Sequence, residues 1–233
     1  MATTYDAVIL AAGDYPTHPI ALQVLQQAPY LVCCDGAAQT LLDHGIIPHA
    51  IVGDGDSLPM AIKQQYPHLV HTESEQEYND LTKATRYILL SLGNTPNGSP
   101  HRGGDVRRTE GVFSVAYLGC TGLREDHTLG NISLIAYYQR EFHIQPVMYT
   151  DHGYFTPALG THTFPTFPGQ QISIFRIGGN TLRSEELRWN AYPYNEWWQG
   201  TLNEALSDHF TIHSDGQYII FQTYEGKKGK SEK

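Results

Sequence analysis

The chain has 233 residues, of which 40% are hydrophobic, and it carries a formal net charge of -9. This length allows one large domain or two small ones, each with a buried core. The negative charge argues against binding to a nucleic-acid backbone. The opening segment "MATTYDAVILAAG" has no basic region before its apolar run, and no window is long enough to cross a bilayer. Neither export nor membrane insertion is therefore expected.

Cysteine and histidine residues form no metal-binding or disulfide pattern. Cys33 and Cys34 are adjacent, Cys120 is distant, and no CxxC occurs, which predicts buried thiols in a reducing compartment, the cytoplasm. The twelve histidines show no HExxH or CxxC/HxxxH spacing. A transition-metal site is therefore not expected.

The first part of the chain alternates short apolar runs with helix-like stretches, which is typical of βαβ units. In "AVILAA" the apolar residues are successive, as in a parallel strand with both faces covered. The pattern predicts a Rossmann-like α/β domain with a parallel sheet. The expected strands are residues 6–13, 30–36, 49–57 and 68–74, and the expected helices are residues 20–27 and 37–45.

A further helix is expected from Asn79, a helix-capping residue type, to Gly93, a helix-stopping one. Between them Leu81, Ala84 and Ile88 form one apolar stripe. Residues 93–111 are rich in glycine, proline and charge, which predicts a mobile surface excursion before a strand over 112–120.

After a helix expected over 126–141, the chain consists of short segments rich in Thr, Tyr, Phe and Ile. This texture predicts an all-β sandwich, with the Asp215-Gly216 pair as the turn of a hairpin. We expect two domains, an α/β domain over residues 1–145 and a β-sandwich over residues 146–233.

Acidic residues follow several of the predicted elements. Asp54 and Asp56 come directly after the third strand, Asp80 opens a helix, and Asp126 opens the helix after "YLGCTGLRE". Each one alone is explained by a turn or a helix cap. Together they predict a cluster at the carboxyl edge of the sheet, where such sheets bind ligands. Oxygen ligands of this kind favour Mg²⁺ and phosphoryl or nucleotidyl chemistry.

Other polar residues fall at the same edge. Asp35 and Gly36 follow a strand, which suits a ribose or a phosphate, although Asp35 could equally cap a helix. Arg124, His127 and Asn131 gather at the start of one helix. A cation, an imidazole and an amide in this place favour a polyphosphate ligand.

Four segments in order resemble the motifs of the thiamine pyrophosphokinase family. These are "CDGAA", "GIIPHAIVGDGDSL", "EQEYNDLTKA" and "LGCTGLREDHTLGNISLI". They match an ADGGA-like turn, a GDxDS stretch, a DQxxTDxxKA helix start and a GGRxDHxxxN helix start, and cover most of residues 5–140. "LRWN" and "GTLNEA" resemble the family's C-terminal domain less closely.

The resemblance implies a homodimer that transfers a pyrophosphoryl group from ATP to thiamine, with thiamine at the subunit interface. It implies Mg²⁺ and catalytic roles for Asp54, Asp56, Asp80 and Asp126, with Asp80 or Asp126 as the general base. The residues implied for ATP are Asp35, Gly36, Ser57, Gln76, Lys83, Arg124, His127 and Asn131. Those implied for thiamine are Gln76, Asp80, Trp189, Thr201 and Asn203.

The sequence departs from the family motifs at two informative positions. Leu123 stands where the second glycine of GGR is expected, and Asn79 replaces the threonine of TDxxK. Two other enzymatic interpretations stay open, a haloacid-dehalogenase-type phosphohydrolase and a pyrophosphokinase for another heterocyclic alcohol. In the hydrolase the acidic motif follows the first strand, whereas here it follows the third. A non-enzymatic ligand-binding module would leave the acidic residues unexplained.

Overall fold

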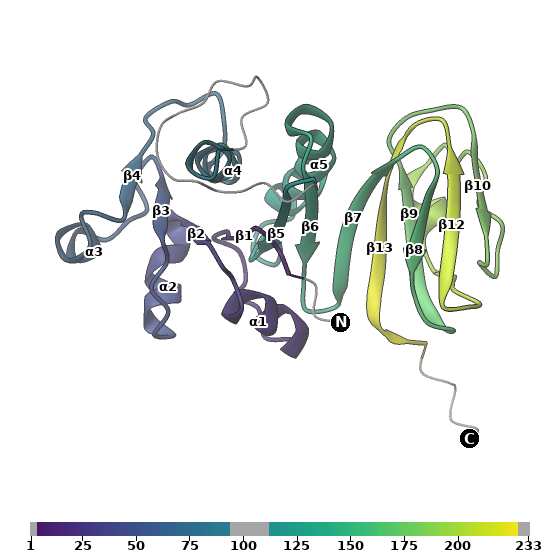
Figure 1. Cartoon of the computed structure of the whole chain (residues 1–233), viewed down its shortest axis with the longest axis horizontal. Coiled ribbons are helices and arrows are strands. Elements are labelled where there is room, and N and C mark those ends of the chain that lie inside the picture. Colours follow the sequence, from purple (N-terminus) through teal and green to yellow (C-terminus); the bar gives the residue numbers. More distant parts are fainter. Residues whose placement is uncertain (1–3, 94–111, 228–233) are drawn as a thin grey trace. The chain divides into compact units, whose positions relative to one another are not determined.

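The computed structural model describes residues 4–93 and 112–227 (Figure 1). It divides into two compact units, of which the first ends at Asp151 and the second begins at His152. The expected division after residue 145 would have separated β6 (Gln145–Tyr149) from the first unit, but β6 pairs with β5 (Ser114–Leu118) in parallel. The first unit therefore extends through β6.

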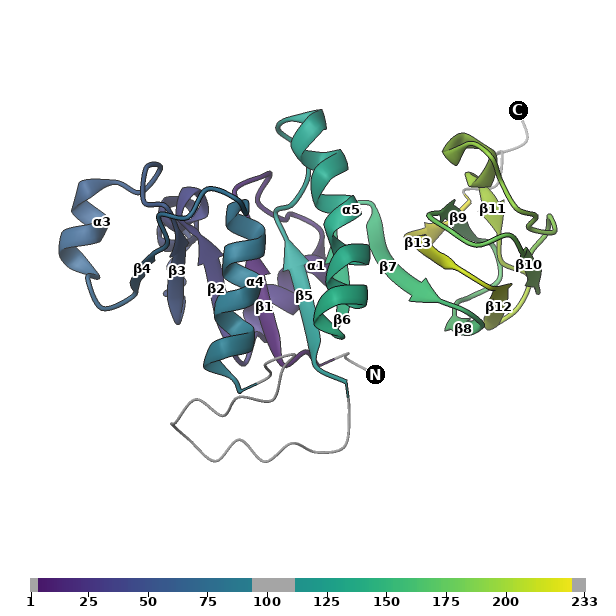
Figure 2. The ribbon, with the colours of Figure 1, turned by 90° about the horizontal axis from the view of Figure 1, so that it is seen from above.

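The first unit is a parallel sheet with helices on both faces, which confirms the predicted fold class. The strand order in space is β6-β5-β1-β2-β3-β4, and every pair is parallel. Figures 1 and 2 show α4 and α5 over one face, and Figure 1 shows α1 and α2 over the other. The remaining bounds are β1 Ala7–Leu10, α1 Pro19–Gln26, β2 Leu31–Cys34, α2 Ala38–Asp43, β3 Ala50–Gly53, α3 Met60–Gln65, β4 Val70–Thr72, α4 Asp80–Ser91 and α5 Glu125–Phe142.

The strand order reverses next to β1. From β1 the chain adds β2, β3 and β4 on one side, whereas β5 and β6 lie on the other side. Loops that leave neighbouring strands in opposite directions open a crevice at the carboxyl ends of those strands. The loops after β1 and β5 flank this crevice, so the topology places a ligand site between them.

Helix α4 begins as the sequence predicts. The side chain of Asn79 accepts a hydrogen bond from the backbone N–H of Thr82 at 3.0 Å, and Gly93 follows the helix with a φ of 73°. Thr82 also shares a hydrogen bond with Tyr138 of α5 at 2.8 Å. These bonds fix the start of α4, and with it Asp80, against the neighbouring helix.

The second unit is a β-sandwich, again as predicted. One sheet has the order β11-β9-β13-β7 and the other β10-β12-β8, and their shared core includes Phe164, Ile174, Phe210 and Tyr218. The bounds are β7 Gly153–Leu159, β8 His162–Pro165, β9 Gln170–Arg176, β10 Leu182–Glu185, β11 Asn203–Glu204, β12 His209–Ser214 and β13 Gln217–Gly226, with a 3₁₀ turn over Trp197–Gly200.

The predicted hairpin at Asp215-Gly216 is wrong. β12 pairs with β10 and β8, while β13 pairs with β7 and β9, so the turn carries the chain from one sheet to the other. The carboxylate of Asp215 accepts hydrogen bonds from the N–H groups of Asn180 and Thr181, at 2.7 and 2.8 Å. It therefore joins two loops instead of closing a pair of adjacent strands.

The three cysteines are free and buried. In the described residues, no helix has the length and apolar character needed to cross a membrane. The excursion expected over 93–111 lies outside the described residues, apart from Gly93.

Candidate active site

A pocket of about 370 Å³ lies in the first unit, at the crevice beside β1. Its walls come from the loops after β1, β2, β3 and β5 and from the starts of α4 and α5. Seven of the predicted site residues line it, namely Asp35, Gly36, Ser57, Asp80, Arg124, His127 and Asn131. Five others do not appear in its walls, namely Asp54, Asp56, Gln76, Lys83 and Asp126.

Asp35 follows β2 and has a role that the sequence did not reveal. Its side chain is only 3% exposed. One carboxylate oxygen accepts from the N–H of Gly36 at 2.7 Å and the other from the N–H of Gly55 at 2.9 Å. A Cβ on Gly53 would lie 2.5 Å from the carboxylate carbon. Asp35 therefore holds the acidic loop after β3 against the end of β2.

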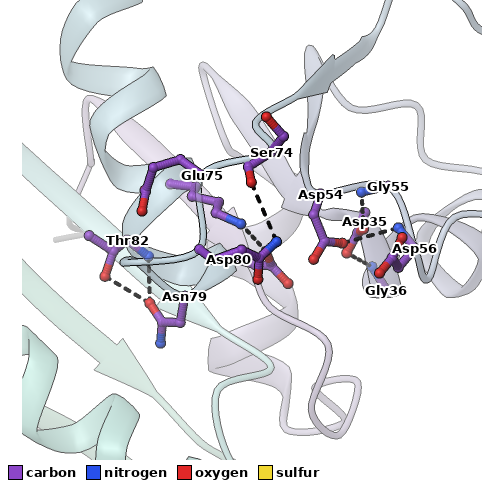
Figure 3. Close-up of polar contacts among 12 residues, drawn as sticks. Asp35, Gly36, Asp54, Gly55, Asp56, Ser74, Glu75, Asn79, Asp80 and Thr82 are labelled. Atoms are coloured by element: carbon purple, nitrogen blue, oxygen red, sulfur yellow. Dashed lines mark hydrogen bonds and ion pairs between the residues drawn. The ribbon is translucent and has the colours of Figure 1, made fainter.

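Asp54 and Asp80 form the negative part of the site. Figure 3 shows their side chains on facing segments, the loop after β3 and the start of α4. The N–H of Asp56 donates to Asp54 at 3.0 Å and is the main cause of its lowered pKa. Burial raises the pKa of Asp80, and repulsion from Asp35 and Asp54 raises it further against the opposing effect of Lys83. The three carboxylates therefore share one electrostatic environment.

Lys83 is buried in α4 and faces Asp80. Its side chain is 2% exposed, and its ammonium lies 3.5 Å from the carboxylate of Asp80, which is 40% exposed. A buried ammonium requires a partner, because removal from water is costly for an isolated charge. In this arrangement Lys83 supports Asp80 from behind, instead of facing the pocket.

At the start of α5, Asp126 is engaged by Arg124. Two N–H groups of the guanidinium donate to the carboxylate, at 3.1 and 2.6 Å, and this pairing lowers the pKa of Asp126 to about 2. Both side chains are largely exposed. Arg124 lines the pocket while Asp126 does not, so the pair places a cation at the pocket wall.

Asn131 ties α5 to the loop after β5. Its side-chain N–H donates to the carbonyl oxygen of Cys120 at 2.8 Å, while the residue also lines the pocket. The loop is bonded to the loop after β1 as well, since the N–H of Gly13 donates to the carbonyl of Gly119 at 2.6 Å. The pocket walls are therefore linked by one side-chain and one backbone hydrogen bond.

Several pocket residues were not predicted as site residues. They are Ala11, Ala12, Gly13, Cys34, Asn79, Leu81, Cys120, Thr121, Leu123 and Thr128. Most have small or uncharged side chains, so residue chemistry alone does not indicate them. The available signal was positional, because "LAAG" ends the predicted strand beside which the strand order reverses.

The donor groups of the site decide which metal ion it could hold. Among the described residues, no three His, Cys, Asp or Glu side chains form a group that could hold a metal ion. Asp54 and Asp80 still provide two hard oxygen donors with excess negative charge. This suits Mg²⁺, which commonly binds through one or two carboxylates together with water and substrate phosphates.

The second unit has its own pocket of about 230 Å³, which brings together the three thiamine residues predicted there. Trp189, Thr201 and Asn203 line it with Tyr194, Gly200 and Leu202. The side-chain N–H of Asn203 donates to the carbonyl of Trp189 at 2.7 Å, and the N–H of Trp189 donates back at 3.2 Å. Asn203 thus fixes the segment that carries Trp189.

Comparison with known families gives two matches along the chain. The family described as thiamin pyrophosphokinase, catalytic domain, matches residues 21–146. The family described as thiamin pyrophosphokinase, substrate-binding domain, matches residues 153–221. The chain belongs to the thiamin pyrophosphokinase family. Membership of this family implies thiamine diphosphokinase activity, with ATP and thiamine as substrates.

Solved structures of thiamin pyrophosphokinases share the fold. The enzyme from Bacillus subtilis matches with a TM-score of 0.70 at 19% identity, covering 94% of this chain and 99% of the other. The Candida albicans enzyme matches with a TM-score of 0.73 at 17% identity, covering 94% of this chain and 90% of the other. The yeast enzyme matches with a TM-score of 0.75 at 18% identity, covering 95% of this chain and 87% of the other. No match is found among curated proteins.

Proposed function

We propose that the pocket of the first unit binds ATP and aligns it for pyrophosphoryl transfer to thiamine. The observation that carries this proposal is the convergence of Asp80, Arg124, His127 and Asn131 on one pocket at the topological reversal. Direct transfer requires the attacking hydroxyl and the leaving oxygen to lie in line with the β-phosphorus. Arg124, at the pocket wall, would orient the phosphates.

Mg²⁺ would be held by Asp54 and Asp80, with Asp56 and Asp126 as the further ligands that the motifs imply. When bound, it would neutralise phosphate charge during the transfer. Lys83 keeps Asp80 in place from the protein interior. Asp35 keeps Asp54 in place through the N–H of Gly55. These two contacts set where the carboxylates stand before a substrate arrives.

Asp80 is the better candidate for the general base that takes the proton of the thiamine hydroxyl. Asp80 lines the pocket, so its carboxylate is within reach of a substrate hydroxyl bound there. Asp126 is held near a pKa of 2 by Arg124 and lies outside the pocket walls. The environment of the two groups thus favours Asp80 over Asp126.

Thiamine would bind against the pocket of the second unit, with the chain acting as a homodimer and the thiamine site at the subunit interface. The support is a set of exposed apolar side chains on that unit, Trp189, Tyr192, Trp197, Trp198, Leu202 and Leu206. Trp189 and Leu202 line the same pocket, and an exposed aromatic face suits the cationic thiazolium of thiamine. We place the reaction in the cytoplasm, in keeping with three free thiols.

Product identification tests this proposal. The protein is incubated with ATP, Mg²⁺ and thiamine, and the nucleotide product is identified by chromatography. We expect AMP in equal amount to thiamine diphosphate. We expect Asp54→Asn to lower turnover by orders of magnitude while folding is kept, because the amide oxygen can still accept the hydrogen bond from the N–H of Asp56. ADP or free phosphate as the product, or normal turnover in a folded Asp54→Asn protein, would contradict the proposal.

A further inference from the structure

One side chain in the wall of the first pocket differs from the rest. Most described residues there are polar or have short side chains. Leu123 is large, apolar and 66% exposed. Leu81 also lines the pocket, but it is only 4% exposed and belongs to the core. In the described part of the wall, Leu123 is therefore the one bulky apolar side chain that a ligand could cover.

The backbone around Leu123 is fixed on both sides. Gly119 and Gly122 have φ values of 63° and 108°, in the left-handed region that glycine adopts at little cost. The N–H of Asp14 donates to the carbonyl of Thr121 at 2.9 Å. A Cβ on Gly122 would lie 2.0 Å from a carboxylate oxygen of Asp14. The loop is thus packed against Asp14, which sets the place of Leu123 on the pocket wall.

We infer that Leu123 is a specificity-determining contact for the base of the nucleotide. The inference rests on the proposed binding of ATP in this pocket. Phosphates are recognised by charge and N–H donors, whereas a nucleobase is the flat, weakly polar part of the molecule whose face an exposed leucine can cover. The hydroxyl of thiamine must approach Asp80 in the first pocket, but its aromatic rings are proposed to lie against Trp189 of the second unit, so Leu123 is assigned to the base.

The chain itself supplies this contact. The GGRxDH motif that the sequence resembles has glycine at this position, which offers no side chain. The free energy of an apolar contact depends on the area that is buried and not on the hydrogen-bonding pattern of the base. Leu123 therefore strengthens the binding of nucleotides over inorganic polyphosphates, without choosing between adenine and guanine.

The test compares ATP with inorganic tripolyphosphate, which has neither base nor ribose. Titration calorimetry in Mg²⁺ gives both affinities for the wild-type protein and for Leu123→Ala. We expect ATP to bind roughly five- to tenfold more weakly to the variant, because apolar contact is removed, while tripolyphosphate binds equally. Leu129→Ala is the matched control, an exposed leucine outside the pocket wall, and should change neither affinity. Leu123→Met, of similar volume, should restore ATP binding.

Three results would overturn the inference. Equal weakening of both ligands would mean that Leu123 shapes the phosphate loop, and unchanged ATP affinity would mean that it makes no contact. A raised KM for thiamine with unchanged ATP binding would assign the side chain to the other substrate. A wild-type protein that neither binds ATP nor forms AMP would instead contradict the proposed function, and the inference with it.

Discussion

Asp35 shows how a single buried carboxylate can position a loop of the site through its own hydrogen bonds. Both of its oxygens accept backbone hydrogen bonds, from Gly36 and from Gly55. Gly53 packs so closely that a side chain there would collide with the carboxylate. The acidic loop after β3 is therefore held in place by Asp35. The predicted nucleotide-binding role of this residue stays a prediction.

Replacing Asp35 with asparagine should destabilise the first unit. One oxygen becomes an NH₂ group that faces an N–H donor, which leaves a buried polar group unsatisfied at a cost of about 1–3 kcal/mol. Urea unfolding followed by far-UV circular dichroism measures this change. Asp43→Asn is the matched control, because Asp43 is exposed and accepts from Gln39 on the surface, so a change within about 0.5 kcal/mol is expected. Equal stability of Asp35→Asn and wild type would refute this role.

At the scale of elements, the turn at Asp215 connects the two sheets of the sandwich. Its carboxylate accepts from the N–H groups of Thr181 and Asn180, and these bonds lower its pKa below the usual 3.8. Gly179 approaches so closely that a Cβ would lie 2.5 Å from a carboxylate oxygen. The ionised carboxylate thus stabilises the link between β9 and β10 on one side and β12 and β13 on the other.

The contribution of Asp215 should depend on pH in one direction. Because its folded-state pKa is lowered, the stabilisation is present above about pH 3.8 and is lost as the pH falls through the lower folded-state value. Asp215→Asn should therefore differ most from wild type near pH 7 and converge with it in acid. Urea unfolding followed by tryptophan fluorescence is suitable, since Trp189, Trp197 and Trp198 all lie in this unit. A difference that stays constant down to pH 3 would contradict the assignment.

At the scale of the whole molecule, local signals predicted the elements and long-range contacts decided the rest. Uninterrupted apolar runs indicated the parallel sheet. Asn79 indicated the start of α4, because a helix-capping side chain bonds to a backbone N–H only three residues further along the chain. The sheet-to-sheet turn at Asp215 was missed, since its partners Asn180 and Thr181 are more than thirty residues away. A dipeptide pattern cannot distinguish such a turn from a hairpin.

In the candidate site, too, local signals indicated some features and long-range contacts decided others. Strand ends predicted that Asp80, Arg124 and His127 lie at one edge of the sheet, because carboxyl ends of parallel strands share an edge. All three line one pocket, and their roles there stay predictions. The structural use of Asp35 depends on where the neighbouring loop lies, and the burial of Lys83 depends on packing around α4. Neither feature has a signature in the residue types alone.

The central claim is that the β- and γ-phosphates of ATP move together to thiamine in one step. The most direct measurement uses ATP labelled with ³²P at the β-phosphorus, with Mg²⁺ and thiamine, and follows the label by chromatography. We predict that the label appears in thiamine diphosphate and that the AMP formed carries none. Label recovered in ADP, or bound covalently to Asp54 as an aspartyl-pyrophosphate, would contradict direct pyrophosphoryl transfer.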